Sequence, residues 1–423
     1  MQTYTICTTP SCADDREPGI LTVDQARQRI LTSLSSLQGE ERLALRSALG
    51  RVLSKDLVSP LNVPGHDNSA MDGYALAGDQ LREGAFLDLQ VIATVAAGDR
   101  FEGYCGPGEC VRIMTGAPMP AGTDTVVMQE QVMELENGRV RIASGHPKGQ
   151  NVRSAGEDIA AGSKVLETGH RLRPADLGVL ASIGIAEVSV KRRVRVAFFS
   201  TGNELRGIGE PLSEGDLYDS NRYSLHGMLK RLDMDMFDLG VVPDDPAALR
   251  EAFASAASLA DVVITSGGVS VGEADYTKPI LEEMGEMNFW KIAMKPGRPL
   301  AFGRLGDALF FGLPGNPVAV MVTFYQFVLP ALEKLASGRA WKPFLVKATC
   351  TSAIRKRPGR YEFVRGLLQG KPDGTFTVEG LGQQGSGILT SMSRGNCFIL
   401  LDEERGDVAA GEHVLTQPFE ALV

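Results

Sequence analysis

The chain has 423 residues, 43% of them hydrophobic and 22% charged, which is a globular composition and more than one ordinary hydrophobic core can use. Its formal net charge of −9 excludes an overall basic surface for nucleic acid, so an anionic substrate would need a local cationic pocket. The longest apolar stretch, residues 317–332, is shorter than a membrane span and contains Gln326 and Pro330, so we expect a buried helix and no membrane partner.

Residues 1–19 are polar and contain no basic region followed by an apolar stretch, so we expect a flexible tail rather than a secretory signal. Six cysteines are few for this length. Cys105 and Cys110 lie close in sequence, but no nearby histidine or second cysteine pair completes a zinc site. The cysteine pattern therefore indicates reduced thiols in a cytoplasmic protein.

Three segments follow the tail. Residues 20–60 predict helices from Val23 to about Leu37 and from Arg42 to Leu53. Residues 61–146 carry short strands and turns, in which Asn137-Gly138 predicts a type I′ hairpin. Residues 147–184 again look helical. A β-rich stretch between two helix-rich ones predicts an inserted β-rich domain (61–146) within a discontinuous linking or dimerisation domain (20–60 and 147–184).

Residues 185–338 alternate between strand and helix patterns, which predicts a doubly wound, mainly parallel α/β domain. The expected strands are Val194–Phe199, Met236–Val242, Asp261–Thr265, Phe289–Ile292 and Ala308–Phe311. The expected helices are Asn221–Leu232, Pro246–Ala257, Tyr276–Met284 and one that begins at Pro317. Short strands with glycine-rich turns in residues 339–423 predict a small C-terminal β-barrel.

Polar residues follow the expected strands of the α/β domain, and the carboxyl ends of such strands meet at the edge where ligands bind. The segments are Ser200–Glu204, Pro243–Asp245, Ser266–Asp275, Lys295–Pro299 and Leu313–Pro317. Ordinary turns explain some of their glycines and serines, but not three acids and a Lys/Arg pair at one edge. We therefore expect a functional site there.

Several of these residues suit a phosphate group. Backbone amides of Ser266, Gly267 and Gly268 can approach a phosphate closely because glycine has no Cβ. Asn316 as N-cap and Pro317 as first helical residue predict a helix N-terminus that favours anions.

Charged residues at the same edge extend the prediction. Lys291, Lys295 and Arg298 could supply cations, although Lys291 could equally be a solvated strand residue. Glu204, Asp244 and Asp275 are oxygen donors suited to Mg²⁺ bound to substrate phosphates, although an acid before Pro246 could simply cap a helix. The chain lacks a P-loop, a complete G-x-G-x-x-G and a Ser-His-Asp or Cys-His nucleophile, so positioning and electrostatics would supply the rate.

Long motifs give the chain a family resemblance. They are Asp67-Asn-Ser-Ala-Met-Asp72-Gly-Tyr, Met114-Thr115-Gly-Ala-Pro118, Gly156-Glu-Asp158-Ile, Ser266-Gly-Gly-Val-Ser-Val-Gly-Glu-Ala-Asp275-Tyr, Lys295-Pro-Gly-Arg-Pro299 and Leu313-Pro-Gly-Asn-Pro317. In this order they resemble the molybdopterin molybdenumtransferases, the family that includes the E domain of gephyrin. The resemblance runs from about residue 20 to the C-terminus.

The resemblance implies an elongated four-domain homodimer whose active sites combine residues of both subunits. Such an enzyme inserts molybdenum from molybdate into adenylylated molybdopterin and releases AMP in the presence of Mg²⁺. A molybdopterin adenylyltransferase, downstream cofactor-modifying enzymes and molybdoenzyme chaperones are then possible partners.

The resemblance also assigns roles to residues in matching motifs. Asp72 and Thr115 would belong to the inserted-domain wall of the cleft, with Asp158 near the domain junction. The acids Glu204, Asp244 and Asp275 would lie around the nucleotide and metal. Lys291 and Lys295 would join these acids and Thr115 as catalytic residues. The substrate-binding set would comprise Arg298, Pro314, Asn316, Pro317, Arg365 and Ser386, together with Ser266, Gly267, Gly268 and Ser270 of the glycine-rich loop. Without the resemblance, Arg365 would be taken as a surface strand arginine.

Two residues depart from the family pattern. Arg298 stands where the family often has lysine, and its planar fork suits an oxyanion. Ala319 stands where serine is common, which removes one possible donor to molybdate. Two other functions remain open at this stage: a nucleotidyltransferase or pyrophosphatase that acts on a pterin nucleotide, and a non-catalytic pterin-binding scaffold.

Overall fold

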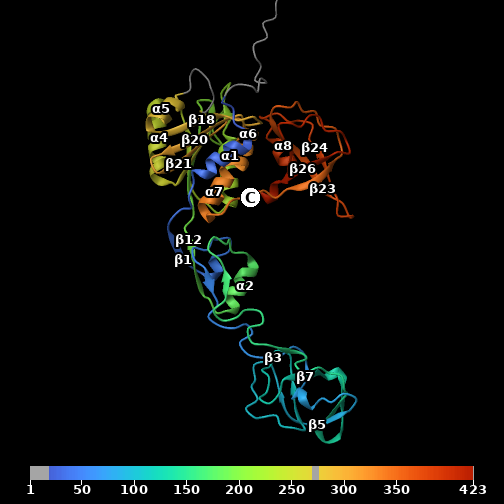
Figure 1. Ribbon diagram of the computed structural model, residues 1–423. Helices are drawn as coiled ribbons and strands as arrows, with labels where there is room; N and C mark the ends of the chain where they lie inside the picture. Colours follow the sequence, from blue (N-terminus) through green and yellow to red (C-terminus); the bar gives the residue numbers. More distant parts are fainter. Residues whose placement is uncertain (1–18, 269–275, 423) are drawn as a thin grey trace, which may run out of the picture. The chain divides into compact units, whose positions relative to one another are not determined.

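The computed structural model describes residues 19–268 and 276–422 (Figure 1). Contacts between residues divide the chain into two compact units. The first unit consists of the residues up to Gly39 together with those from Lys191 onward, and the second unit is the continuous stretch Glu40–Val190. The chain thus leaves the first unit after Gly39 and returns to it at Lys191.

The first unit contains a six-stranded sheet in the order β16-β13-β17-β21-β20-β18. Its strands are β13 (Arg195–Thr201), β16 (Asp235–Val242), β17 (Val262–Ser266), β18 (Gly285–Lys291), β20 (Pro299–Leu305) and β21 (Ala308–Leu313). β16, β13, β17 and β21 run parallel, and β20 is antiparallel to both of its neighbours. The predicted doubly wound, mainly parallel sheet is confirmed, but the sequence pattern missed β20.

Alternating side chains of the central strands divide the apolar residues between two cores. Phe198 and Ile264 face one core with helices α3 (Ser220–Arg231) and α6–α7 (Pro317–Ser337). Phe199 and Val263 face the other, with α4 (Pro246–Leu259) and α5 (Thr277–Met284). Because helices cover both faces of the sheet, the sequences of these strands are continuously apolar and do not alternate with polar residues.

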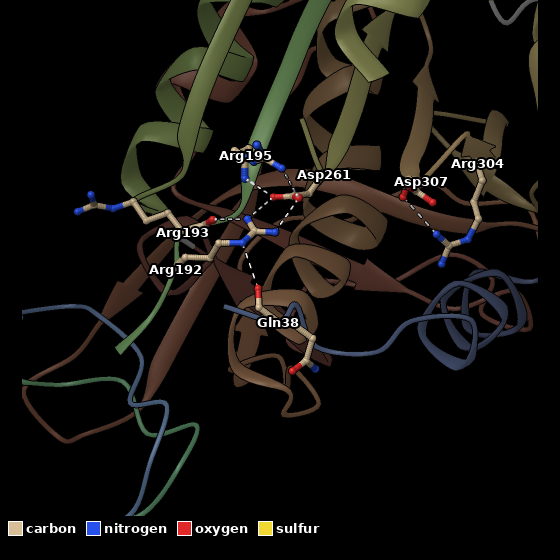
Figure 2. A network of polar contacts seen from close by, with 7 residues as sticks. All are labelled: Gln38, Arg192, Arg193, Arg195, Asp261, Arg304 and Asp307. Carbon is tan, nitrogen blue, oxygen red and sulfur yellow. Dashed lines mark hydrogen bonds and ion pairs between the residues drawn. The ribbon is translucent and has the colours of Figure 1, made fainter. Parts of the chain in front are cut away.

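The amino-terminal edge of this sheet carries an ion-pair network (Figure 2). Nη1 and Nη2 of Arg192 donate to the two carboxylate oxygens of Asp261, at 2.7 and 2.9 Å. Arg195 reaches the same carboxylate at 3.2 Å, and Arg192 Nε donates to the Gln38 carbonyl at 3.1 Å. These arginines hold the pKa of Asp261 at about 2 although burial acts to raise it.

The long helix from Pro317 is interrupted by a π-helical turn, Phe324–Val328. Pro330 has no N–H for the Gln326 carbonyl, and Arg27 of α1 (Val23–Thr32) donates to that carbonyl from Nε at 3.2 Å. Among the described residues, this helix alone is long and apolar enough to cross a membrane, and 83% of its apolar window is buried inside the protein.

The C-terminal part of the first unit is a closed barrel. Its strands are β22 (Val346–Cys350), β23 (Tyr361–Gly370), β24 (Phe376–Gly380), β25 (Cys397–Leu401) and β26 (His413–Pro418), and β23 pairs with β25 to close it. The two-residue strand β19 (Met294–Lys295) pairs in parallel with β23. The predicted barrel is confirmed. A short helix, α8 (Thr390–Arg394), lies before β25.

The second unit, Glu40–Val190, holds a six-stranded sheet in the order β7-β4-β6-β5-β9-β8 with an apolar core on each face. Its strands are β4 (Gly73–Leu76), β5 (Leu87–Val95), β6 (Glu109–Ile113), β7 (Thr125–Met128), β8 (Val132–Glu134) and β9 (Arg139–Ile142). β8 and β9 form the predicted hairpin, in which Asn137 and Gly138 have φ of 62° and 68°. Leu135 closes the loop on Arg139, so Glu136 also belongs to it.

A separate core in the second unit surrounds α2 (Pro174–Ser182). Two short pairs of strands contribute to it: β1 (Glu40–Ala44) with β12 (Glu187–Lys191), and β2 (Leu57–Val58) with β11 (Lys164–Leu166). A third pair, β3 (Asn68–Ser69) with β10 (Val152–Arg153), lies next to the six-stranded sheet, where Val152 packs against one of its cores.

Two helix predictions near the N-terminus were wrong in part. The expected helix Arg42–Leu53 is replaced by β1 and a 3₁₀ turn, because Glu40–Ala44 alternates in burial and pairs with β12. The helix from Val23 ends at Thr32. It contacts α7 and belongs to the first unit, whereas the sequence grouped residues 20–60 together.

Candidate functional site

Four loops of the first unit meet at the carboxyl edge of the central sheet. β13 leads to Gly202–Glu204, β16 to Pro243–Asp245, β17 to Gly267–Gly268, and β21 to Pro314–Asn316. Their strands are consecutive in the sheet, so the loops are neighbours. After β13 the chain forms β16 on one side of it and then β17 on the other side. The strand order therefore reverses next to β13, and such a topological switch point is where sheets of this kind bind ligands.

The loop after β17 requires glycine at two positions. Gly267 and Gly268 have φ of 93° and 64°, a region that other residues rarely adopt. A Cβ on Gly267 would lie 2.6 Å from the Thr201 carbonyl oxygen, and one on Gly268 would lie 2.4 Å from Thr277 Oγ1. The buried Thr201 hydroxyl beside them has no hydrogen-bond partner in the described chain. The loop therefore has a close-packed backbone that only glycine allows, and its Gly267 amide donates to the Leu313 carbonyl at 3.1 Å.

Two of the three predicted acids lie together beside this loop. Burial raises the pKa of Asp244, and the nearby negative charge of Glu204 raises it further. Asp245 caps α4 by accepting from the amides of Ala247 and Ala248, so Asp244 is not needed as the helix cap. The third acid, Asp275, lies outside the described residues, as does Ser270. The described acids form a pair, which suits a divalent cation that also binds substrate phosphates.

A groove of about 590 Å³ continues from the same loops toward the edge strand. Its walls include Gly202, Asn203, Arg206, Arg222 and Pro243. Asn203 accepts a hydrogen bond from the Asp244 amide at 3.1 Å, which connects the groove wall to the acid pair.

The predicted lysines and Arg298 come from the antiparallel side of the sheet. Lys291 ends β18 and pairs in register with Pro299, the first residue of β20, so Arg298 and Lys291 lie at the same edge. The Arg298 carbonyl accepts from the Ile292 amide at 2.8 Å, which closes the intervening loop. Within that loop, Lys295 Nζ lies 3.4 Å from Glu362 Oε2 of the barrel.

Arg365 is the largest fully buried side chain, with 1% exposure. Its Nε donates to Ser391 Oγ at 3.1 Å, and Nη1 and Nη2 donate to the carbonyls of Phe363 and Gly385 at 3.4 and 3.1 Å. No carboxylate of the described chain pairs with it. Burial lowers its pKa to about 10, so the guanidinium remains charged at neutral pH. A buried guanidinium is costly unless it is paired or hydrogen-bonded, and here one hydroxyl and two carbonyls take the place of a carboxylate.

The helix that begins at Pro317 lies beside this arginine. The Val318 amide donates to the Ser386 carbonyl at 3.0 Å, and Ser386 follows Gly385, which accepts from Arg365. Asn316 is the N-cap, although its side chain makes no capping bond. Ala319, in the first turn, is buried. The helix N-terminus and Arg365 therefore lie close together, connected through the carbonyls of Ser386 and Gly385.

The remaining predicted residues lie in the second unit. Asp72 Oδ1 accepts from the amide and the hydroxyl of Thr115 at 2.7 and 2.8 Å, and these bonds lower its pKa. Asp67 accepts from the Ala155 amide, which gives it a structural role within the loop. Asp158 is exposed, and its amide donates to the Val63 carbonyl. The structure thus brings Asp72 and Thr115 together.

Sequence reasoning missed Asn221, the second residue of α3. Its Nδ2 donates to Ser266 Oγ at 2.8 Å and to the Gly315 carbonyl at 2.6 Å. It therefore bridges the loops after β17 and β21. The only signal in the sequence is a polar residue in an otherwise amphipathic helix, which solvent exposure would explain equally well.

Comparisons with protein families cover nearly the whole chain. Residues 21–184 match the MoeA N-terminal region (domains I and II), residues 197–334 match a probable molybdopterin binding domain, and residues 347–419 match the MoeA C-terminal region (domain IV). The chain is 46% identical over 405 residues to a molybdopterin molybdenumtransferase of Haemophilus influenzae, covering 96% of this chain and all of that protein. The chain belongs to the molybdopterin molybdenumtransferase family.

Other members of the molybdopterin molybdenumtransferase family are more distant. The chain is 36% identical to the Nostoc enzyme, with 91% of this chain and 90% of that protein covered. It is 30% identical to gephyrin of Dictyostelium discoideum, covering 93% of this chain and 61% of gephyrin. The crystal structure of the MoeA protein from Pyrococcus horikoshii has a TM-score of 0.83 at 30% identity, with 95% and 100% of the two chains covered. The family identity and the fold predicted from the motifs are both confirmed.

Proposed function

We propose that this transferase inserts molybdenum from molybdate into adenylylated molybdopterin and releases AMP, a reaction that Mg²⁺ assists. The observation that carries the proposal is Arg365, a buried guanidinium without a carboxylate partner in the described chain, next to the helix N-terminus at Pro317. Molybdate is a tetrahedral dianion, and a guanidinium fork with a helix N-terminus binds such an anion well.

The substrate's phosphates would bind on the other side of the same edge. The Gly267–Gly268 loop would let a phosphate approach the backbone closely because neither residue has a Cβ, and the groove beside Asn203 has room for the nucleoside. Glu204 and Asp244 would hold Mg²⁺, which would neutralise the phosphate charge when bound.

The chain's own residues would act by binding and orientation. Lys295 and Arg298 would hold anionic oxygens near the bond that breaks, and the helix N-terminus would stabilise charge that develops there. A site of this kind needs no covalent enzyme intermediate.

The deciding experiment supplies purified protein with adenylylated molybdopterin, molybdate and Mg²⁺, and follows AMP and active cofactor. We expect AMP release that depends on molybdate. Arg365→Met should abolish the molybdate dependence, whereas Arg360→Met on the same barrel should retain it. AMP release that is independent of molybdate in the unmodified protein would instead favour a pyrophosphatase, and binding without release would favour a scaffold.

We further propose a homodimer whose active site combines Asp72 and Thr115 of one subunit with the α/β domain of the other. The support is the family membership and the bonded pair of Asp72 and Thr115, a built polar site in a unit that lacks the phosphate loop. Mixing inactive Asp72→Ala and Asp275→Ala subunits should restore part of the activity. Failure of mixed dimers to regain activity would contradict a shared site. A molybdopterin adenylyltransferase, downstream cofactor-modifying enzymes and molybdoenzyme chaperones are the proposed partners.

A further inference from the structure

Asn221 connects two loops that come from different strands. Ser266 ends β17 and begins the glycine loop, and Gly315 lies between β21 and the helix at Pro317. Nδ2 of Asn221 reaches Ser266 Oγ at 2.8 Å and the Gly315 carbonyl at 2.6 Å. Asn221 itself is 9% exposed, so these bonds are shielded from water. One carboxamide group thus satisfies an acceptor in each loop.

The two loops also touch each other directly. The Gly267 amide donates to the Leu313 carbonyl at 3.1 Å, and a Cβ on Gly315 would lie 3.9 Å from Gly267 Cα. Glycine loops sample many backbone conformations unless other contacts restrict them. The contacts from α3 supply this restriction in the loop that would contact the substrate's phosphates.

We propose that Asn221 is a positioning residue that fixes the phosphate-binding loop of Ser266–Gly268 in register with the helix N-terminus at Asn316. The inference rests on the proposed function, because it names the residue that organises the phosphate side of that site. Asn221 acts through Ser266 and Gly315 and does not itself contact the ligand.

The chemistry at position 221 requires a donor. Asn221 Oδ1 is buried and has no hydrogen-bond partner in the described chain, so the amide nitrogen makes both bridging bonds. An aspartate there would have the same shape but would place a carboxylate oxygen against the Gly315 carbonyl. Because a buried acceptor without a donor is costly, Asn221→Asp should release the Gly315 loop more than Asn221→Ala does.

The first test measures ligand binding by the full-length protein. AMP with Mg²⁺ and molybdate alone are titrated calorimetrically into the unmodified protein, Asn221→Ala and Asn221→Asp. We expect AMP affinity to fall about tenfold in Asn221→Ala and further in Asn221→Asp. Molybdate affinity should change less than twofold, because Arg365 keeps its partners.

Asn396 provides the matched control. Its side chain also makes two hydrogen bonds to backbone groups: it donates to the Leu368 carbonyl at 2.9 Å and accepts from the Leu368 amide at 2.7 Å. These bonds lie in the barrel and not beside the glycine loop. Asn396→Ala should lower Tm without changing AMP affinity. If Asn221→Ala lowers Tm in the same way and leaves AMP affinity unchanged, its role is structural and the proposal is overturned.

A second readout does not depend on the substrate. Hydrogen exchange of the amides at residues 266–268 and at Gly315, Asn316 and Val318 should accelerate together in Asn221→Ala and stay slow in Asn396→Ala. Should the unmodified protein fail to bind AMP, the proposed function fails, and hydrogen exchange alone then decides the role of Asn221. Unchanged exchange in both segments would contradict that role. Ser266→Ala combined with Asn221→Ala should cost no more AMP affinity than Asn221→Ala alone, and additive losses would show that the two residues act independently.

Discussion

Arg192 and Asp261 form a two-point ion pair at the amino-terminal edge of the α/β sheet, at 2.7 and 2.9 Å (Figure 2). The Asp261 side chain is only 9% exposed, so its ionised form is stabilised by Arg192, by the Arg195 guanidinium and by the Arg195 amide rather than by water. Arg192 also holds Gln38 and Gly39 through their carbonyls. The ion pair therefore fixes both places where the chain passes between the two units.

Asp261→Asn should lower the free energy of unfolding by roughly 2 kcal/mol at pH 7, because the folded-state pKa of about 2 lies below the ordinary value of 3.8. A depressed carboxylate pKa stabilises the folded state above the unfolded pKa, and that contribution is lost as pH falls from about 4 toward 2. Urea unfolding at pH 7 and pH 3 should show the difference between the two proteins shrinking with acid.

Asp307 is the control for this prediction because it lies near the same edge and only its carbonyl accepts from Arg304. Asp307→Asn should change stability by less than about 0.5 kcal/mol at either pH. An effect of Asp261→Asn that is equally large at pH 3 would show that the stabilisation does not come from the ionised carboxylate.

Gly268→Ala should destabilise the protein by about 2 kcal/mol and weaken AMP binding, because φ is 64° and the new Cβ would approach Thr277 Oγ1 to 2.4 Å. Gly315→Ala is the matched change in the neighbouring loop, where the nearest atom would be 3.9 Å away. Thermal unfolding and AMP titration should distinguish the two. Equal losses of stability and AMP affinity in both variants would mean that the close contact with Thr277 is not what requires glycine at position 268.

Asp244→Asn should raise Tm and abolish turnover. Burial and the charge of Glu204 raise the Asp244 pKa, so keeping this carboxylate ionised costs folding free energy as pH rises above the unfolded value of 3.8. Removing the charge should therefore stabilise the protein at pH 7 and have little effect at pH 3. The measurement is Tm against pH, with Mg²⁺-dependent AMP release in parallel. A lower Tm of Asp244→Asn at pH 7 would contradict the conclusion that the ionised Asp244 carboxylate destabilises the folded protein.

Gln326→Leu should lower the free energy of unfolding by about 1–3 kcal/mol. Gln326 Oε1 accepts from Arg27 at 2.9 Å and its Nε2 donates to Gln417 at 2.9 Å, and both glutamines are 2% exposed. Leucine has a similar volume but would leave Arg27 and Gln417 without these buried partners. In urea denaturation, adding Gln417→Leu to Gln326→Leu should cost less than the sum of the two single changes.

Much of the α/β domain could be predicted from the sequence because its buried strands are continuous apolar runs bounded by loops. The same pattern placed the Asp244, Gly267 and Pro314 loops at one edge, and the sheet order makes them neighbours. β20 was missed because it follows the Lys295–Pro299 turn directly and has no helix before it. The Arg42–Leu53 helix was wrong because pairing between β1 and β12 across more than a hundred residues outweighs local helix preference.

The site was less predictable where its chemistry depends on tertiary contacts. Arg365 is a functional candidate because it is buried without a carboxylate, and a strand position alone does not reveal that. Asn221 functions through two carbonyl or hydroxyl acceptors that are 45 and 94 residues away in the chain. Conversely, the position of Glu204, Asp244 and the two glycines at one sheet edge could be predicted, because they directly follow buried apolar strands.

The Arg192 amide donates to the Gly39 carbonyl at 3.2 Å, so the two ends of the segment Glu40–Val190 lie next to each other on the first unit. Such adjacent ends are the geometry of an insertion between two residues of a surface turn. A gene that joins Gly39 to Lys191 through a short glycine linker should therefore yield a foldable α/β-plus-barrel protein. Swapping the intervening segment among relatives would then test the proposed contribution of Asp72 and Thr115 without changing the α/β domain.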